Sequence, residues 1–562
     1  MNPKDYGLNP KDGGLNPSRI VEKMEEQMEN DSKMTRREAL NLIGGAAGIA
    51  AMYQLMGSYA LAAESPIKEG EVFEQLKGAP KGASILVLGA GIAGMTAAYE
   101  LRKAGYSVKI LEYREKAGGR CWSLRGGDVF KELGGAVQKC EFDKGLYINP
   151  GPWRIPYNHY GILSYCKQFG VALEPFIQVN YNALVHSTTA FEGKPQRFRK
   201  VQADFQGHIA ELLTKTASAG ALDKTLSKDE KTALIDALRS WGALDKDGKY
   251  TASHASAERR GFAKWPGGGL MDHPDGTPST DILEGKELIK SKLWSRIITG
   301  QFHEFQSTIF QPVGGMDQVA AGFEKQVKNL IKYNVRVTAI TQDQTGVIVS
   351  YEDSNKPSKT LTEKADYCVC TLPLSILSQM PLTVSAPMKA AIDAVPYDAS
   401  VKVGLQFKRR FWEEQDIYGG ITYTNTPIST IAYPNCDYGK PGKGVLLGAY
   451  IWGRNAYEFT SMSPKGRIDA ALKYGEMIHP EYKKEFDTGV AVGWHRVPWT
   501  NGCYGLWTDE SREKHYKNLC QVDGRIVLAG EHASYIPAWM EGAVLSAHDA
   551  IKRLHATIVA KN

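Results

Sequence analysis

The chain has 562 residues, of which 43% are hydrophobic and 23% are charged. This length predicts two or three domains, and the globular composition excludes a disordered chain. Lys and Arg total 68 and Asp and Glu total 62, so the formal net charge is +6. Because this excess is small and forms no long basic run, nucleic acid is not an expected partner.

Residues 1–63 predict a leader rather than a folded domain. The Pro- and Gly-rich stretch at 2–17 is expected to be disordered. Arg36 and Arg37 then precede a Gly- and Ala-rich apolar run that closes on Ala60-Leu61-Ala62. This pattern is typical of a twin-arginine export signal, with a membrane anchor as the alternative. We therefore predict a periplasmic or secreted protein without stable membrane insertion after cleavage, and a cytoplasmic one if the signal is not used.

The first folded segment carries a dinucleotide-binding pattern. An apolar strand at 84–88 leads into Gly89, Gly91 and Gly94 at G-x-G-x-x-G spacing, and a helix follows. The three glycines allow a tight turn, close approach of a pyrophosphate, and close packing of helix on strand. A second strand ends in Glu112, whose carboxylate can accept hydrogen bonds from a ribose diol. The segment therefore predicts a bound dinucleotide.

Further glycine-rich groups narrow the cofactor. Gly118-Gly119-Arg120 follows Glu112, and Gly530-Glu531 and Trp539-Met540 lie near the C-terminus. The set resembles the flavin-containing amine oxidase superfamily, in which FAD extends along both ends of the chain. The cofactor contacts that this resemblance implies are Gly89, Gly91, Ala93, Gly94, Glu112, Gly119, Arg120, Gly151, Pro152, Trp153, Val337, Gly530, Glu531, Trp539, Met540 and Ala543.

The segment Gly151-Pro152-Trp153-Arg154 makes the resemblance more specific. It is similar to the L-amino-acid oxidases of venom and bacterial type, in which the matching arginine holds the substrate carboxylate. A guanidinium suits this role because its fork donates two parallel hydrogen bonds to a carboxylate. A surface arginine paired with an acid is the alternative reading. The further substrate contacts that the resemblance implies are Tyr433, Tyr504, Ala538 and Trp539.

Lys402 stands in an apolar, strand-like run. A buried lysine is costly, so it either points outward from an alternating strand or has a function. In the superfamily the matching lysine holds a water against flavin N5, and Lys402 is therefore the catalytic candidate.

The eight cysteines form no quartet at metal-ligand spacing. Cys368 and Cys370 lie in an apolar run that predicts buried thiols, so we expect no structural metal and no disulfide framework. Cys503 stands where monoamine oxidases link their flavin through a thioether. The L-amino-acid oxidases hold FAD without a covalent bond, so non-covalent FAD is expected and a link at Cys503 is the minor alternative.

The predicted fold class is α/β, with a helical insertion. Helical runs are expected at Ala203–Ala217, Lys228–Trp241 and Gly285–Trp294, with Ser227 and Glu230 at capping-box spacing before the second. Alternating runs that predict an antiparallel sheet lie at Val401–Phe407 and Gly444–Trp452. The expected domains are a discontinuous, Rossmann-like FAD-binding domain (78–150, 312–378 and 505–562), a mixed α+β substrate domain (151–195 and 379–504) and a helical cap (196–311).

The resemblance implies oxidative deamination of L-amino acids to 2-oxo acids, with release of ammonia and hydrogen peroxide. No acid or base side chain is obvious, so the protein is expected to act by positioning and electrostatics. The alternatives are an amine oxidase whose substrates lack a carboxylate, an amino-acid 2-monooxygenase, and a redox-inert nucleotide-binding protein. The expected partners are an L-amino acid, O2 and further copies of this chain in a homodimer or higher homo-oligomer.

Overall fold

In the computed structural model, the described residues are 73–357 and 359–561. The leader and export signal expected within residues 1–63 lie outside this range. Among the described residues, no helix is both long enough and apolar enough to cross a bilayer.

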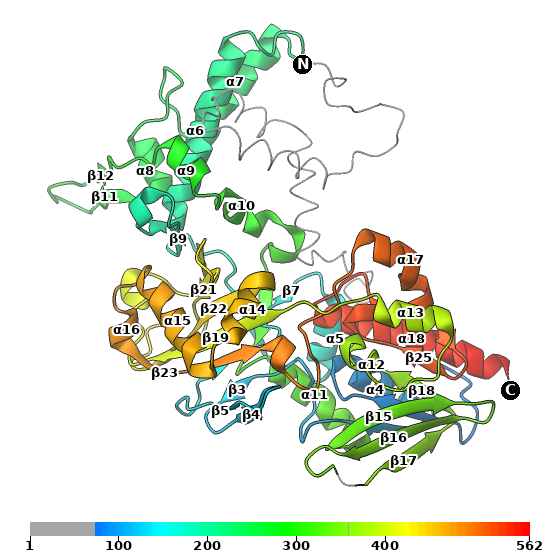
Figure 1. Ribbon diagram of the computed structural model, residues 1–562. Coiled ribbons are helices and arrows are strands. Elements are labelled where there is room, and N and C mark those ends of the chain that lie inside the picture. The colour runs from blue at the N-terminus through cyan, green and yellow to red at the C-terminus, as the bar shows by residue number, and fades with distance from the viewer. Residues whose placement is uncertain (1–72, 358, 562) are drawn as a thin grey trace. The chain divides into compact units, whose positions relative to one another are not determined.

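A six-stranded sheet forms the first core of the fold (Figure 1). All neighbouring strands run parallel except the last pair. Strands from three distant parts of the chain therefore build one Rossmann-like sheet, which confirms the predicted fold class. In spatial order the strands are β14 (Ile331–Lys332), β2 (Ser107–Leu111), β1 (Ser84–Leu88), β18 (Tyr367–Cys370), β25 (Ile526–Leu528) and β24 (Val522–Asp523).

Side chains along β1 alternate between two hydrophobic cores. Ile85 and Val87 lie in one core and Leu86 and Leu88 in the other. Because successive strand side chains point to opposite faces, a continuously apolar strand suits a sheet that is covered on both sides. The first core contains helices α4 (Ile92–Lys103), α5 (Tyr160–Gln168), α11 (Asp317–Val327) and α18 (Met540–Ala560). The second contains strands β15 (Val335–Gln342), β16 (Val347–Asp353) and β17 (Leu361–Ala365) and helices α12 (Leu374–Leu377), α13 (Ala386–Asp393) and α17 (Asp509–Cys520).

A second, seven-stranded sheet is mostly antiparallel, with one parallel pair. It contains both alternating runs that the sequence predicts to be strands. In spatial order it consists of β10 (Gln196–Arg197), β9 (Leu184–His186), β20 (Ile421–Thr424), β21 (Thr430–Ala432), β22 (Gly444–Trp452), β19 (Ser400–Phe407) and β23 (Phe486–Gly493). Residues of α14 (Gly453–Ser461), α15 (Pro464–Glu476) and α16 (Tyr482–Glu485) pack on one face.

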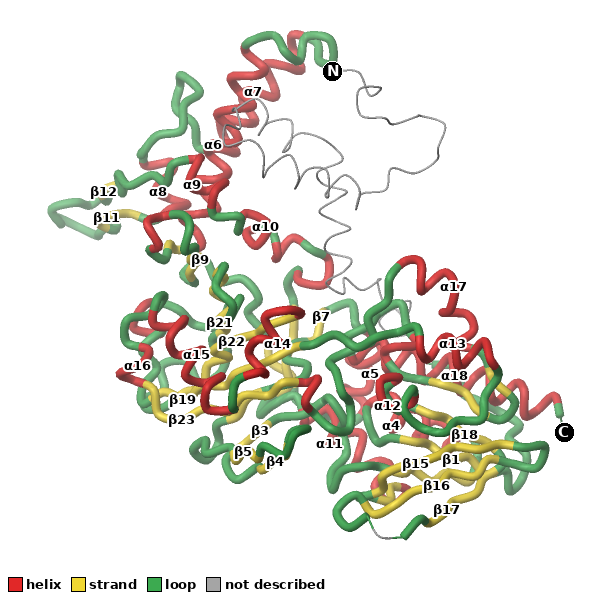
Figure 2. Tube along the Cα trace, viewed as in Figure 1, coloured by secondary structure: helices red, strands yellow, loops and turns green. Residues whose placement is uncertain are grey.

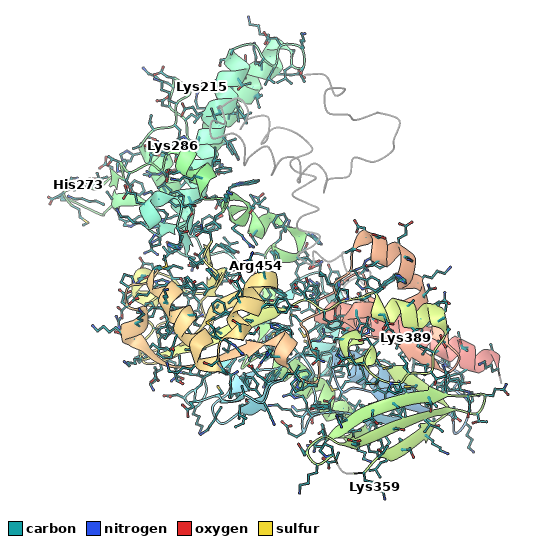
Figure 3. All side chains as sticks on the ribbon, viewed as in Figure 1. Lys215, His273, Lys286, Lys359, Lys389 and Arg454 are labelled. Carbon is teal, nitrogen blue, oxygen red and sulfur yellow. The ribbon has the colours of Figure 1, made fainter. Side chains whose placement is uncertain are left out.

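The segment between β10 and β13 (Ile309–Pro312) is mainly helical (Figure 2). The predicted capping box forms, since Ser227 and Glu230 each accept the other's backbone N–H. The third expected helix is interrupted, because Lys292 has a φ of +56° between two short helices. Lys215 and Lys286 lie on the surface of this insertion (Figure 3). Its helices are α6 (Phe198–Ser218), α7 (Lys228–Gly242), α8 (His254–Arg260), α9 (Gly285–Lys290) and α10 (Trp294–Ile297).

The insertion returns to the rest of the fold through a small antiparallel sheet. In it, β13 pairs with β7 (Ile155–Pro156) on one side and with β8 (Leu173–Pro175) on the other. Because β7 directly follows Arg154, this pairing brings the end of the insertion next to that arginine.

Candidate active site

The glycine-rich turn between β1 and α4 has the shape of a phosphate site. Gly89 has a φ of +96°, and a Cβ on Gly94 would meet the Gly89 carbonyl oxygen at 1.9 Å. A Cβ on Gly91 would meet no atom within 4 Å among the described residues, so open space faces this glycine. Ala93 is buried in the first turn of α4. The turn therefore leaves room for a pyrophosphate at the N-terminus of the helix.

Glu112 lies at the end of β2 and is 5% exposed. Its carboxylate accepts the N–H groups of Ala90 at 2.6 Å and Arg114 at 2.9 Å. Burial raises the pKa of this carboxyl, against the two hydrogen bonds that lower it. The Glu112 carbonyl accepts the Val335 N–H at 2.8 Å, and this contact brings the start of β15, with Val337, to the same end of the sheet.

Arg120 and Glu531, which are 411 positions apart in the chain, form an ion pair. Arg120 Nη1 donates to Glu531 Oε1 at 2.7 Å and to the Cys503 carbonyl at 2.8 Å. The other carboxylate oxygen, Oε2, accepts the Ala538 N–H at 3.1 Å. The remaining cofactor candidates lie close by in the chain or in space: Gly119, whose Cβ would approach Gly91 to 3.2 Å, Gly530, which precedes Glu531, and Met540 and Ala543, which lie in the first turn of α18.

Lys402, on β19, is 2% exposed and does not face solvent. Its Nζ donates to the carbonyls of Gly151 at 2.5 Å and Asn149 at 3.3 Å. The same atom lies 4.9 Å from the ring centre of Trp153 and 4.4 Å from that of Tyr450. Burial lowers the pKa of Lys402 to about 7. The outward-facing alternative therefore does not fit, and the catalytic role of Lys402 stays a prediction.

Gly151, whose carbonyl accepts from Lys402, precedes Pro152 in the chain. A Cβ on Gly151 would lie 1.9 Å from the Arg120 carbonyl oxygen, so only glycine fits at this crossing. The segment Gly151-Pro152-Trp153-Arg154 is thereby held between the Arg120 backbone and the Lys402 side chain.

Arg154 lies in an aromatic cage. Its guanidinium carbon is 4.4 Å from the ring centre of Phe305, 5.0 Å from that of Trp153 and 5.8 Å from that of Trp539. Its Nε is buried without a hydrogen-bond partner, and no acidic side chain of the described residues forms an ion pair with it. Burial lowers its pKa to about 10, a shift that nearby side chains partly oppose. The alternative of a surface arginine paired with an acid therefore does not fit.

The tyrosines that neighbour Arg154 are Tyr450 and Tyr423, and not Tyr433. Tyr450 is the cross-strand neighbour of Lys402, and Arg154 acts on its pKa, which burial raises. Tyr433 lies in the core on the other face of the sheet, where its hydroxyl is 2.7 Å from both Thr422 Oγ1 and His479 Nε2. The expected role of Tyr433 at the substrate carboxylate does not fit this position, because strand side chains alternate between faces.

The other substrate candidates stay near the site. Trp539 lies edge-on to His159 at 4.9 Å, and its Nε1 is buried without a partner among the described residues. Ala538 has a φ of +67°. Tyr504 is buried and packs edge-on against Trp452 at 5.8 Å.

Cys503 is a free thiol beside Lys402, as are the other seven cysteines elsewhere in the chain. Burial raises the pKa of Cys503 to about 11, and the charges of Arg120 and Lys402 partly oppose this rise. The described residues contain no group of three or more His, Cys, Asp or Glu side chains that could hold a metal ion.

Sequence reasoning missed three site residues. The alternation along β22, compared with the position of Lys402 on β19, contains the signal for Tyr450. Glu304 and Phe305 lie in a one-turn 3-10 helix, His303–Phe305, at the end of the insertion. No periodicity in the sequence indicates these two residues. They lie near Arg154 because β13 pairs with β7.

A Rossmann-like sheet with a phosphate-binding turn, next to a second sheet that contributes a buried lysine, defines a dinucleotide-dependent enzyme. A family model described as flavin containing amine oxidoreductase matches residues 92–554, and the chain belongs to this family. It is thus a flavoprotein oxidoreductase. The open turn at Gly91, the carboxylate of Glu112 and the N-terminus of α18 fit a flavin dinucleotide.

Two relatives are similar in sequence over most of the chain, and one solved structure is similar in fold. An L-amino-acid oxidase of Siganus canaliculatus is 30% identical over 475 residues, which cover 82% of this chain and 83% of that protein. One of Bothrops pauloensis is 27% identical over 477 residues, 82% of this chain and 87% of that protein. The structure of cyclohexylamine oxidase from Brevibacterium oxydans has a TM-score of 0.55 at 16% identity and covers 86% of this chain and 99% of that one. The last likeness shows a shared fold.

Proposed function

We propose that the protein is an FAD-dependent L-amino-acid oxidase. It converts an L-amino acid, O2 and water into a 2-oxo acid, ammonia and hydrogen peroxide. The observation that carries this proposal is Arg154, a half-buried arginine whose guanidinium lies among three aromatic rings and forms no ion pair with an acidic side chain of the described residues. A desolvated charge that no counter-ion contacts directly is costly, and the α-carboxylate of an amino acid supplies such a contact. The names of the Siganus and Bothrops relatives support the same substrate class.

The chain's own residues bind and orient the substrate. Arg154 donates a charge-assisted pair of hydrogen bonds to the carboxylate, and Tyr450 donates its hydroxyl to the same group. The rings of Trp153, Phe305 and Trp539 exclude water and so strengthen these contacts. When bound, FAD supplies the acceptor for a hydride from the substrate Cα and the route by which O2 takes up the electrons.

Lys402 provides a titratable amine beside the substrate site. An ammonium has three N–H donors, and Gly151 and Asn149 accept two of them. The third is available for a water. Because the pKa of Lys402 is about 7, its Nζ can hold or release a proton near neutral pH.

The test compares amino acids with their decarboxylated amines. The purified holoprotein is mixed anaerobically with each L-amino acid and with the matching amine, and the yellow flavin absorbance is followed. We expect bleaching by amino acids, and hydrogen peroxide with a 2-oxo acid once air is admitted. Bleaching by amines alone supports an amine oxidase, an amide product supports a 2-monooxygenase, and no bleaching by any compound supports a redox-inert protein. Each of these outcomes overturns the proposal.

The export route, the homo-oligomer and the non-covalent state of FAD belong to the same proposal and stay predictions. Mass measurement of the denatured protein tests the last of these, because a thioether at Cys503 keeps the flavin on the chain.

A further inference from the structure

A buried acidic side chain lies beside Arg154. Glu304, in the short 3-10 helix His303–Phe305, is 2% exposed. Its Oε2 lies 2.9 Å from His159 Nε2, whereas its Oε1 is buried without a hydrogen-bond partner among the described residues. Buried carboxylate oxygens are almost always hydrogen-bonded, because leaving one unpaired is costly. The unpaired oxygen therefore points to a ligand that brings a donor.

The neighbours of Glu304 place it in the substrate site. Phe305, the next residue, covers the Arg154 guanidinium at 4.4 Å. His159, which binds Glu304, lies edge-on to Trp539 at 4.9 Å. Burial lowers the pKa of Arg154, and the charge of Glu304 is close enough to raise it in part. Two opposite charges thus stand in one aromatic-walled site without forming an ion pair with each other.

We propose that Glu304 selects basic L-amino acids, those with an ammonium or guanidinium on the side chain. This rests on the proposed function, because it takes the α-carboxylate as bound to Arg154. Such a substrate carries an anion at one end and a cation with N–H donors at the other, in the same order as Arg154 and Glu304. Its side chain supplies the donor that Oε1 lacks.

The same carboxylate acts against other side chains. A neutral apolar side chain leaves Oε1 unpaired when the substrate closes the site, which costs binding. An acidic side chain meets like-charge repulsion. Glu304 thus favours basic substrates by binding them, and it disfavours neutral ones because its Oε1 then stays unpaired.

The competing interpretation is that Glu304 has only a structural role, because its contact with His159 joins the insertion to the residue before α5. The two roles differ in what they change. If Glu304 has a structural role, its loss lowers kcat/KM for every substrate. If it selects substrates, its loss changes only their order of preference.

The experiment measures kcat/KM of the holoenzyme for L-arginine, L-lysine, L-leucine and L-methionine. We expect the wild type to prefer the two basic substrates, and Glu304→Gln to lower their kcat/KM about 10- to 100-fold with little change for the neutral two. Glu284→Gln is the matched control, since Glu284 is an exposed acid of the same insertion that pairs with Lys286. It should behave as the wild type.

A binding measurement keeps the test independent of turnover. Desamino-arginine (5-guanidinopentanoate) lacks the α-amine and so cannot be deaminated, and pentanoate is its neutral counterpart. Perturbation of the flavin spectrum gives the Kd of each in wild type, Glu304→Gln and the shorter Glu304→Asp. We expect both variants to weaken only the guanidino compound. An equal loss for all substrates and both acids, or a wild type that prefers neutral substrates, overturns the inference. A wild type that oxidises no L-amino acid instead overturns the proposed function.

Discussion

Lys402 and Tyr450 face each other across neighbouring strands, with the lysine Nζ 4.4 Å from the centre of the tyrosine ring. This cross-strand pair fixes which face of the seven-stranded sheet belongs to the site. Along β19, the side chains on either side of Lys402, those of Val401 and Val403, pack in the core on the other face of the sheet.

The pairing predicts different results for two tyrosines. Tyr450→Phe should lower kcat/KM for L-amino acids about 10-fold, because it removes one hydroxyl donor to a charged group. Tyr433→Phe should leave kcat/KM nearly unchanged but lower the melting temperature, since its hydroxyl contacts Thr422 and His479 in the core. Steady-state kinetics and thermal unfolding of both variants check this. A large kinetic loss in Tyr433→Phe alone contradicts the placement.

These two tyrosines also show what the sequence can predict. Residue-level patterns were sufficient for β1, the glycine turn, Glu112 and the capping box of α7, because each depends on neighbours in the chain. Choosing between Tyr433 and Tyr450 needs the face of the sheet on which each lies, and that depends on strand pairing between β19 and β22. A resemblance between short motifs does not contain that information.

Glu304 could not be predicted from the sequence for a similar reason. Glu304 lies in a one-turn helix that carries no apolar period. It meets His159, which is 145 positions away, only because the insertion returns through β13. Residues placed by such long-range packing are identified from the fold and not from the local pattern.

Lys402→Met should slow the reaction of the flavin with O2 more than its reduction by substrate. Methionine has about the same volume but lacks the charge and the donor that, on the proposed function, orders a water. Loss of a proton-transferring group costs about 100- to 10,000-fold in rate. Stopped-flow absorbance resolves the two half-reactions. Lys408→Met, an exposed lysine just after β19, is the control. Unchanged rates in both half-reactions of Lys402→Met contradict the role.

The pH dependence of the same step follows from the sign of the shift. Burial lowers the pKa of Lys402 to about 7, so Nζ is mostly protonated below pH 7 and mostly neutral above it. A positive charge stabilises the negative charge that develops on O2. The rate with O2 should therefore fall as pH rises through about 7. The bend should be absent from the pH profile of Lys402→Met, and a bend that persists there belongs to another group.

A stability prediction concerns Arg467, which is buried with Glu132. Its two Nη atoms donate to the two carboxylate oxygens of Glu132 at 2.6 and 2.8 Å, and each side chain is 1% exposed. Arg467→Met leaves a buried carboxylate without its counter-ion, which costs about 3–5 kcal/mol of unfolding free energy. Denaturant unfolding measures this. Adding Glu132→Gln should recover part of the loss, and the exposed Lys465→Met should change little.

Arg154→Met tests the observation on which the proposed function depends. Removing one partner of a buried, charge-assisted pair costs about 2–5 kcal/mol, which is roughly 30-fold to several thousand-fold in kcat/KM. FAD should stay bound, because its expected contacts are at Gly91, Glu112 and Glu531. The flavin absorbance of the purified variant checks retention, and Arg454→Met, which changes an exposed arginine (Figure 3), is the matched control.

The same variant tests substrate class and handedness together. On the proposed function, Arg154 and Tyr450 hold the carboxylate and the aromatic rings direct the side chain, so that only one hydrogen of Cα faces the flavin plane. The wild type should therefore oxidise L- and refuse D-amino acids. In Arg154→Met the preference for an amino acid over its decarboxylated amine should shrink, because the amine never used the guanidinium. If Arg154→Met keeps near-normal kcat/KM for L-amino acids, another group holds the carboxylate, and the reason for preferring an amino-acid oxidase over an amine oxidase is lost.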